Sequence, residues 1–292
     1  MSTTNHGEYF IPEPSKWPIV GTIALTTTVI GAVNTIHSGE LNLLLPVGFL
    51  LIAYLLFGWF GAVIDESMAG KYNEQVDRSF RIGMLWFIFS EVMFFAAFFG
   101  TLFYIRVFVI DWLGGGGNNF MTHQLLWPGF ESVWPLLTNP DNAAVTGPKQ
   151  AMGPGGLPAI NTAILLLSSV TVTIAHHGLR QNHRKPLIIW LAATVALGIV
   201  FLFFQVQEYV HAYDDKMGLT FDSGIYGSTF FMLTGFHGMH VTLGTTMLLV
   251  MLVRAIKGLF TSDNHFAFEA VAWYWHFVDV VWLGLFVFVY WL

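Results

Sequence analysis

The sequence predicts an all-α, polytopic membrane protein. Of its 292 residues, 55% are hydrophobic and only 10% are charged, whereas soluble domains carry roughly 25% charged residues. So few charges could not cover the surface of a soluble fold. The apolar residues also come in runs of the length that a helix needs to cross a bilayer, about 20 residues. These runs are much longer than the strands of a membrane β-barrel and lack their alternation of polar and apolar residues.

Seven apolar segments are long enough to cross the membrane as helices. The first is the weakest because it contains three consecutive threonines, and the only long connection, residues 107–156, separates the third and fourth segments. Glycine and proline punctuate this connection, so we expect turns there rather than a domain. The predicted spans are 17–36, 41–65, 81–106, 157–178, 187–210, 225–253 and 270–292.

The distribution of basic residues predicts the orientation. With a cytoplasmic N-terminus, all of the 12 Lys and Arg residues except Arg106, Lys149 and Lys216 fall in cytoplasmic segments. Cytoplasmic loops of membrane proteins are enriched in basic residues. Seven spans then place the C-terminus and the loop 107–156 on the outer face.

Composition also excludes several classes of function. The chain has no cysteine, which excludes a disulfide framework, a thiolate metal site and a catalytic cysteine. The net charge of −6 gives no indication of nucleic-acid binding. The polar start of the chain, residues 1–18, lacks the basic and then apolar order of a signal peptide, so we expect the first span to direct insertion.

Glu91 is the first candidate functional residue. It lies ten residues into the third predicted span, about 15 Å deep at 1.5 Å per residue. An ionisable group at this depth is a functional hypothesis by default, as a proton-handling or gating group. The structural alternative is a protonated acid that hydrogen-bonds a neighbouring helix.

Two histidines, His237 and His240, lie near the middle of the sixth span in GFHGMHVTLG (235–244). Their spacing places them on one helix face, where they could bind a metal or hydrogen-bond across helices. No convincing third ligand accompanies them, so no metal is expected. The glycines of this motif indicate close helix approach. We expect Glu91 to hydrogen-bond His237 or His240, because all three lie near mid-depth.

His276 and Asp279 lie three residues apart in the last span, on one helix face. A water-filled path or a static network would satisfy them. Four further residues stand at the ends of spans, where a solvated helix end is the simpler interpretation: His176, His177, Glu208 and His211.

A further group of residues falls on the cytoplasmic side in this topology. Basic pockets between spans on that side bind anionic lipid headgroups, although ordinary positive flanking of the spans would give the same pattern. The group consists of Trp59, Asp65, Glu66, Lys71, Arg254 and Lys257.

Five long motifs resemble subunit III of the haem–copper cytochrome c oxidases, in the same order and with seven spans. A looser similarity extends to EPSKWPIVG at 13–21. The motifs are RIGMLWFIFSEVMFF (81–95), LPAINTAILLLSSVTVTIAHHGL (157–179), QVQEYVHAY (205–213), DSGIYGSTFFMLTGFHGMHVTLG (222–244) and HFAFEAVAWYWHFVDVVWL (265–283).

The resemblance implies a fold and a role. It implies a two-helix part, residues 1–66, and a five-helix part, residues 67–292, with lipids in a V-shaped cleft between them. It implies a non-catalytic subunit without haem or copper, which are carried by partner subunits of a proton-pumping oxidase that reduces O2 to water. The implied partners are the catalytic haem–copper subunit I, a cupredoxin-bearing subunit II, a small subunit IV and membrane phospholipids. The implied role is to support proton uptake and to stabilise the catalytic subunit during turnover.

The resemblance also assigns residues. Glu91 corresponds to the family's carbodiimide-reactive carboxylate, and Trp59, Glu66 and Arg254 correspond to positions that contact cleft lipid. Many members have histidine where this chain has Lys71 and Tyr72. The outer loop is longer than in mitochondrial relatives, which favours a bacterial plasma (inner) membrane.

Two alternatives remain open at this stage. A quinol oxidase subunit III is similar in sequence but typically has five spans. A freestanding proton-coupled transporter would use Glu91, His237 and Asp279, and it predicts helices broken by Gly and Pro at the site.

Overall fold

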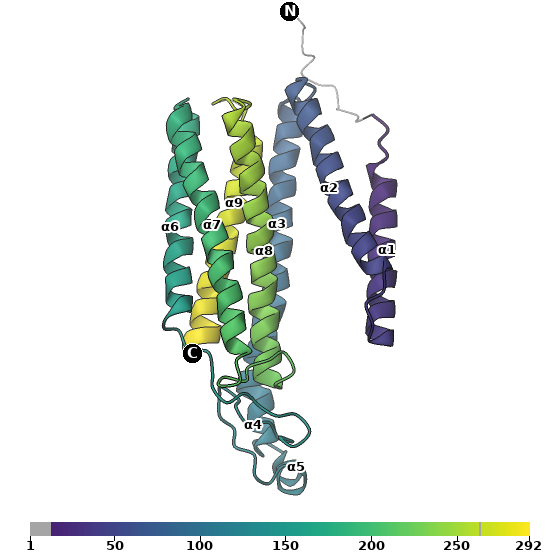
Figure 1. Ribbon diagram of the computed structural model, residues 1–292, viewed down its shortest axis with the longest axis vertical. Coiled ribbons are helices and arrows are strands. Elements are labelled where there is room, and N and C mark those ends of the chain that lie inside the picture. The colour runs from purple at the N-terminus through teal and green to yellow at the C-terminus, as the bar shows by residue number, and fades with distance from the viewer. Residues whose placement is uncertain (1–12, 263) are drawn as a thin grey trace, which may run out of the picture. The chain divides into compact units, whose positions relative to one another are not determined.

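The computed structural model describes residues 13–262 and 264–292, and every regular element within them is a helix (Figure 1). Residues 1–12, which include most of the polar start, lie outside the described residues. Seven helical segments of the described chain are long and apolar enough to span a membrane, so the predicted polytopic all-α class is confirmed. They are α1 (Trp17–Ser38), α2 (Leu44–Met68), α3–α4 (Glu74–Leu113), α6 (Leu157–Arg180), α7 (Arg184–Ala212), α8 (Ile225–Ile256) and α9 with its terminal π-turn η2 (Phe266–Trp291).

The third span is longer than predicted at both ends. α3 (Glu74–Tyr104) runs through the π-helical η1 (Ile105–Val109) into α4 (Ile110–Leu113). The apolar pattern shows only 81–106, because the added N-terminal turns are polar. There Glu74 carries a negative charge in the first turn, which the helix dipole favours.

The described chain forms two compact units, one ending at Gly83 and the other beginning at Met84. In the first unit, α1 packs along α2. A Cβ at Gly48 of α2 would overlap the backbone and the hydroxyl of Thr28 on α1. A small residue at this position therefore lets the two helix backbones approach closely.

In the second unit, α6 to α9 form a closed ring of helices. α6 and α8 each pack against both α7 and α9, and the four run side by side in Figure 1. The indole rings of Trp275 and Trp282 on α9 are almost fully buried. Each donates its N–H to a hydroxyl of α6, at 2.9 Å from Ser168 Oγ and 2.9 Å from Thr162 Oγ1 respectively. Polar side chains thus join helices that are otherwise apolar.

The expected close approach at the glycines of 235–244 is confirmed at Gly244. A Cβ there would lie 2.8 Å from the Trp275 ring. At Gly238 nothing lies within 4 Å, and at Gly235 the nearest atom is the Tyr209 hydroxyl at 3.6 Å. Gly238 therefore faces open space, and a Cβ at Gly235 would make only an ordinary van der Waals contact.

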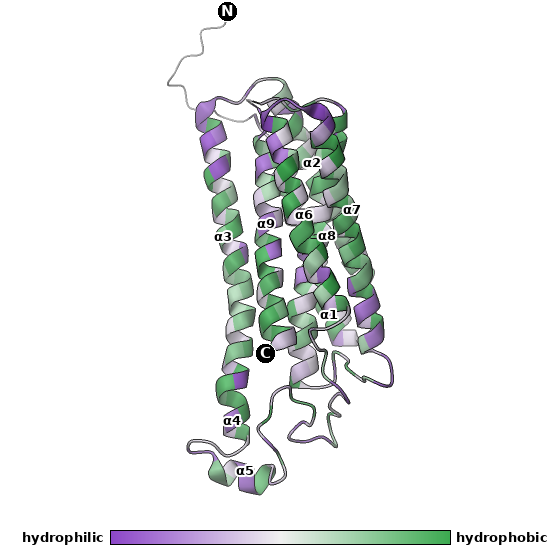
Figure 2. Cartoon of the chain, turned by 90° about the vertical axis from the view of Figure 1, so that its left-hand side faces the viewer, coloured by the Kyte–Doolittle hydropathy of each residue, from purple (hydrophilic) through white to green (hydrophobic). Residues whose placement is uncertain are grey.

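The outer faces of the helices are apolar. Figure 2 shows hydrophobic residues along most of each long helix and hydrophilic residues gathered at the helix ends. Many large apolar side chains are exposed, such as Phe57 at 70% and Val280 at 67%. A surface of this kind matches a lipid environment, where apolar side chains need no covering.

The long loop between α4 and α6 contains turns, as predicted, together with one short helix, α5 (Phe120–Leu126). Its second half is fastened to the segment between α7 and α8. Asn139 is buried and donates to the carbonyls of Val145 and Ser223 at 2.9 and 3.2 Å, and the N–H of Met152 donates to the Tyr226 hydroxyl at 3.0 Å. The loop is therefore part of the folded second unit.

Candidate functional site

Glu91 of α3 pairs with His240 of α8, which confirms the predicted hydrogen bond to one of the two histidines. The Glu91 carboxylate oxygen Oε2 lies 2.8 Å from His240 Nε2. The side chains are 23% and 5% exposed. Phe94 and Phe95 follow Glu91 by three and four residues, so they lie on the same face of α3 and turn towards α8 with it.

The hydrogen bonds of His240 show which ring nitrogen must carry a hydrogen. Nδ1 lies 2.7 Å from the carbonyl oxygen of Phe236, one turn earlier in α8. A carbonyl only accepts, so Nδ1 carries a hydrogen. The bond between Nε2 and Glu91 then needs one more proton, held either by the carboxyl or by the imidazole. The pair has no net charge in either arrangement, which makes it tolerable within a membrane span.

Aromatic rings enclose the pair. The His240 ring centroid lies 4.9 Å from that of Phe95 and 6.3 Å from that of Tyr274, whose ring is nearly parallel at 15°. Phe277 completes this side at 6.5 Å. Apolar surroundings of this kind strengthen a hydrogen bond and penalise its loss.

His237, one turn away, is not part of this pair. Its ring is fully buried between Phe201 and Trp282, with centroids at 5.7 and 5.0 Å. Its Nε2 donates to the carbonyl oxygen of Val278 on α9 at 3.1 Å. His237 thus joins α8 to α9, while His240 joins α8 to α3.

His276 and Asp279 are close in space but do not hydrogen-bond each other. His276 Nδ1 lies 2.7 Å from Ser169 Oγ on α6 and 3.9 Å from Asp279 Oδ2. Asp279 is 4% exposed, and neither of its carboxylate oxygens has a hydrogen-bond partner among the described residues. The two residues therefore lie within ion-pair distance of each other without a direct hydrogen bond.

The residues that the sequence assigns to lipid binding fall in both compact units. In the first unit, Trp59 is 45% exposed and Glu66 accepts a hydrogen bond from the Tyr72 hydroxyl at 2.7 Å. Burial above all, and then the hydrogen bond to Glu66 and the Glu66 charge, raise the pKa of Tyr72, so it stays a donor. Lys71 forms a 3.2 Å ion pair with Glu13, and both partners are solvent-exposed.

In the second unit, Arg254 and Lys257 end α8. The Arg254 guanidinium lies over the Phe260 ring at 4.7 Å. Its Nε is buried without a hydrogen-bond partner among the described residues. Lys257 is exposed.

Glu208 and His176 are not the solvated helix ends that the sequence predicts. Glu208 is 1% exposed and accepts a 2.6 Å hydrogen bond from the Tyr290 hydroxyl. This contact could not be inferred from the sequence, because Tyr290 lies 82 residues away, in η2 (Phe286–Trp291). His211 and His177 are exposed, as expected.

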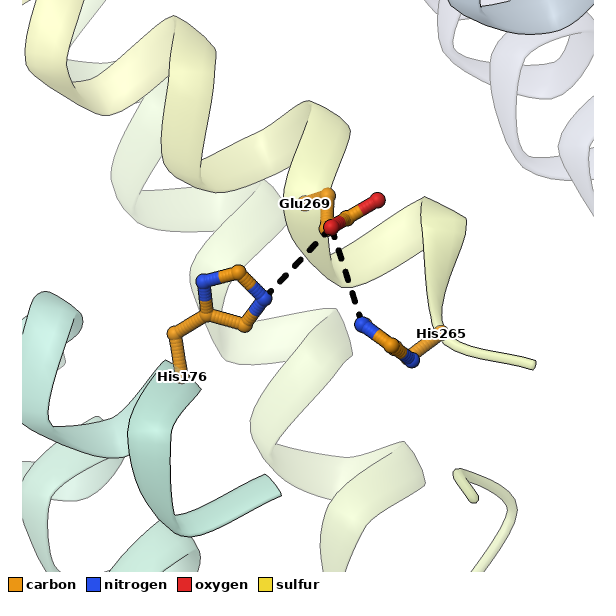
Figure 3. Close-up of side chains that lie close together, drawn as sticks. All are labelled: His176, His265 and Glu269. Atoms are coloured by element: carbon orange, nitrogen blue, oxygen red, sulfur yellow. Dashed lines mark ion pairs between the residues drawn. The ribbon is translucent and has the colours of Figure 1, made fainter. Parts of the chain in front are cut away.

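His176 lies in a cluster with His265 and Glu269, residues that sequence reasoning missed. Figure 3 shows both imidazoles directed at one carboxylate oxygen of Glu269. The spacing of His265 and Glu269, four residues apart, places them on one face of a helix and was visible in the sequence. The contribution of His176 from α6 was not.

Comparison with known proteins identifies the family. The sequence family described as "Cytochrome c oxidase subunit III" matches residues 7–116 and 118–292. The chain belongs to the cytochrome c oxidase subunit III family. It is 41% identical over 292 residues to a probable cytochrome c oxidase subunit 3 of Rickettsia bellii, covering 99% of this chain and 96% of that protein. It is also 39% identical over 284 residues to cytochrome c oxidase subunit 3 of Sus scrofa, covering 97% of this chain and 96% of the relative.

Membership of the subunit III family places the buried polar pairs in a subunit of a larger complex. The chain is a multi-pass membrane subunit of a respiratory oxidase complex. Family members carry no redox cofactor, and the chemistry of oxygen reduction belongs to the complex. Glu91 and His240 thus lie in a subunit without a redox cofactor, where each satisfies the polar group of the other.

Proposed function

We propose that the chain is a non-catalytic, lipid-binding subunit III that supports proton uptake by the catalytic subunit and stabilises it during turnover. Arg254 carries this proposal. A guanidinium is a bidentate donor matched to phosphate, and the Nε of Arg254 has no partner among the described residues. A phospholipid headgroup at the end of α8, with Lys257 beside it, would supply the missing acceptor.

The proposal extends to the other predicted lipid ligands and to the surroundings of the subunit. Trp59 and Glu66 would contact lipid from a functional part formed by residues 1–66. Lys71 would contact it from the other part, formed by residues 67–292. The partners would be the haem–copper subunit I, the cupredoxin-bearing subunit II and a small subunit IV. The length of the loop 107–156 supports a bacterial plasma (inner) membrane, and the basic residues support an N-terminus in the cytoplasm and a C-terminus in the periplasm.

Arg254→Ala is expected to reduce the phospholipid that co-purifies with the complex and to speed the loss of activity during turnover. The initial rate of electron transfer should stay nearly intact, because no redox group lies in this subunit. Phosphate analysis of the purified complex and the time course of oxygen consumption measure the two effects.

Lys185→Ala is the matched control, since Lys185 is an exposed basic residue in the first turn of α7. It should leave both the lipid content and the time course unchanged. An immediate collapse of electron transfer in Arg254→Ala, or an unchanged lipid content, would contradict the proposed role.

A further inference from the structure

The cluster of His176, His265 and Glu269 lies at the end of the second unit opposite the long loop. His176 comes from the last turns of α6, His265 immediately precedes α9, and Glu269 lies in the first turn of α9. The side chains are 25%, 12% and 18% exposed respectively. They are therefore largely sheltered by protein while still reachable by a small ion.

The distances within the cluster are too long for hydrogen bonds and suit a shared ligand. Oε1 of Glu269 lies 3.7 Å from His176 Nε2 and 3.6 Å from His265 Nε2, and 3.6 Å exceeds the hydrogen-bond range. One ligand atom from each of the three residues lies within 4.8 Å of the others. Tetrahedral zinc with ligands at about 2.0–2.2 Å requires ligand atoms separated by roughly 3.3–3.6 Å. Both nitrogen–oxygen distances are thus within a small side-chain adjustment of that geometry.

The hydrogen-bonding state of the histidines points the same way. His176 Nε2, the ligand atom nearest Glu269, is buried and has no hydrogen-bond partner among the described residues. Buried polar atoms in native proteins are ordinarily paired. A cation in contact with Glu269 Oε1 would provide the missing partner for His176 Nε2.

We propose that His176, His265 and Glu269 bind a divalent cation of the zinc class. Two imidazoles and one carboxylate suit zinc, whereas calcium and magnesium prefer sites made only of oxygen. Three protein ligands leave a fourth position for water. The ion would clamp the end of α6 to the start of α9. The proposal concerns a site apart from Glu91 and Arg254 and stands independently of the proposed lipid-binding role.

The test is zinc binding to the intact oxidase complex, purified without a polyhistidine tag and stripped with a chelator. Titration with Zn2+ alone should show one more equivalent bound per complex in the wild type than in His265→Ala or in Glu269→Gln. Affinity at this site should fall more than about 100-fold in each variant, since loss of an outer-shell partner alone costs 10–100-fold. His177→Ala is the matched control and should bind as the wild type, because His177 is the exposed neighbour of His176.

X-ray absorption at the zinc edge gives a structural readout of the site. The spectrum of the wild-type complex minus that of His265→Ala should show two imidazole nitrogens and one carboxylate oxygen around the metal. If either variant fails to assemble, crystals of the wild-type complex loaded with one equivalent of zinc provide the test. An anomalous diffraction map then gives the position of the metal. Equal zinc content in wild type and variants, or a map without metal between α6 and α9, would overturn the site.

Discussion

Trp275→Ala is expected to destabilise the second unit by about 3 kcal/mol, the largest effect of any single truncation in this chain. Truncation of a buried Trp or Phe to Ala in the core of a soluble protein costs about 3–5 kcal/mol of stability. The lower end applies here because helices in lipid lack the hydrophobic driving force between them. The Trp275 ring is 0% exposed and lies against Gly244, so the cavity could not be filled by a small rearrangement.

Thermal unfolding of the complex, followed by the retention of this subunit, measures the effect. A loss of about 3 kcal/mol lowers the melting temperature by about 10 °C in a protein of this size. Trp291→Ala is the control, because Trp291 is 68% exposed and belongs to the same terminal segment. A melting temperature of Trp275→Ala within a degree or two of wild type would contradict the conclusion that Trp275 of α9 is a main packing residue of the second unit.

A second variant separates packing from hydrogen bonding at this position. Trp275→Phe keeps most of the ring and removes the N–H that donates to Ser168. Interhelical hydrogen bonds in membranes contribute about 0.6 kcal/mol on average and at most about 1.7 kcal/mol. Trp275→Phe should therefore have less than about half the effect of Trp275→Ala.

The second large expected effect is energetic coupling between Glu91 and His240. A double-mutant cycle with Glu91→Ala and His240→Ala should give a coupling of about 1–2 kcal/mol, at the upper end of the values for helix pairs in membranes. The aromatic enclosure of the 2.8 Å bond explains the high value, because a low local dielectric strengthens the bond. Retention of the subunit in the complex against temperature supplies the four stabilities.

Two companion variants make the coupling specific. Glu91→Gln should stay close to wild type, because the amide can donate to Nε2 or accept from it. A cycle between Glu91→Ala and His237→Ala should show no coupling, since His237 donates to Val278 instead. Equal coupling of Glu91 to both histidines would mean that the pair is not an independent contact.

The seven spans and the Glu91–histidine contact were predictable from the sequence, because both depend on length and depth. A run of apolar residues defines a span, and groups at equal depth on neighbouring helices tend to meet. Which histidine meets Glu91 was not predictable. His237 and His240 differ by less than a turn of α8, and the rotation of that helix depends on its packing against both α7 and α9.

The contacts that sequence reasoning missed join residues far apart in the chain. Tyr290 reaches Glu208 from 82 residues away, and a polar residue at a span end is more simply interpreted as solvated. The extra turns of α3 were missed for a different reason. Their start is marked by the acidic Glu74 and Asp77 in the first turn and by a 3.0 Å hydrogen bond from the Val76 N–H to Asn73 Oδ1, which a hydropathy pattern does not record.

The contacts of α9 have a consequence for biosynthesis. α9 follows α6 and α8 in the chain, yet it supplies the partners of Ser168 and Thr162 on α6 and of His237 on α8. Until it is inserted, His237 lacks the Val278 carbonyl that accepts its hydrogen bond, whereas the hydroxyls of Thr162 and Ser168 still donate to Pro158 and Leu165 within α6. Chains that stop before residue 265 would hold a membrane-embedded imidazole without this partner, a difference by which membrane proteases can distinguish them from the finished subunit.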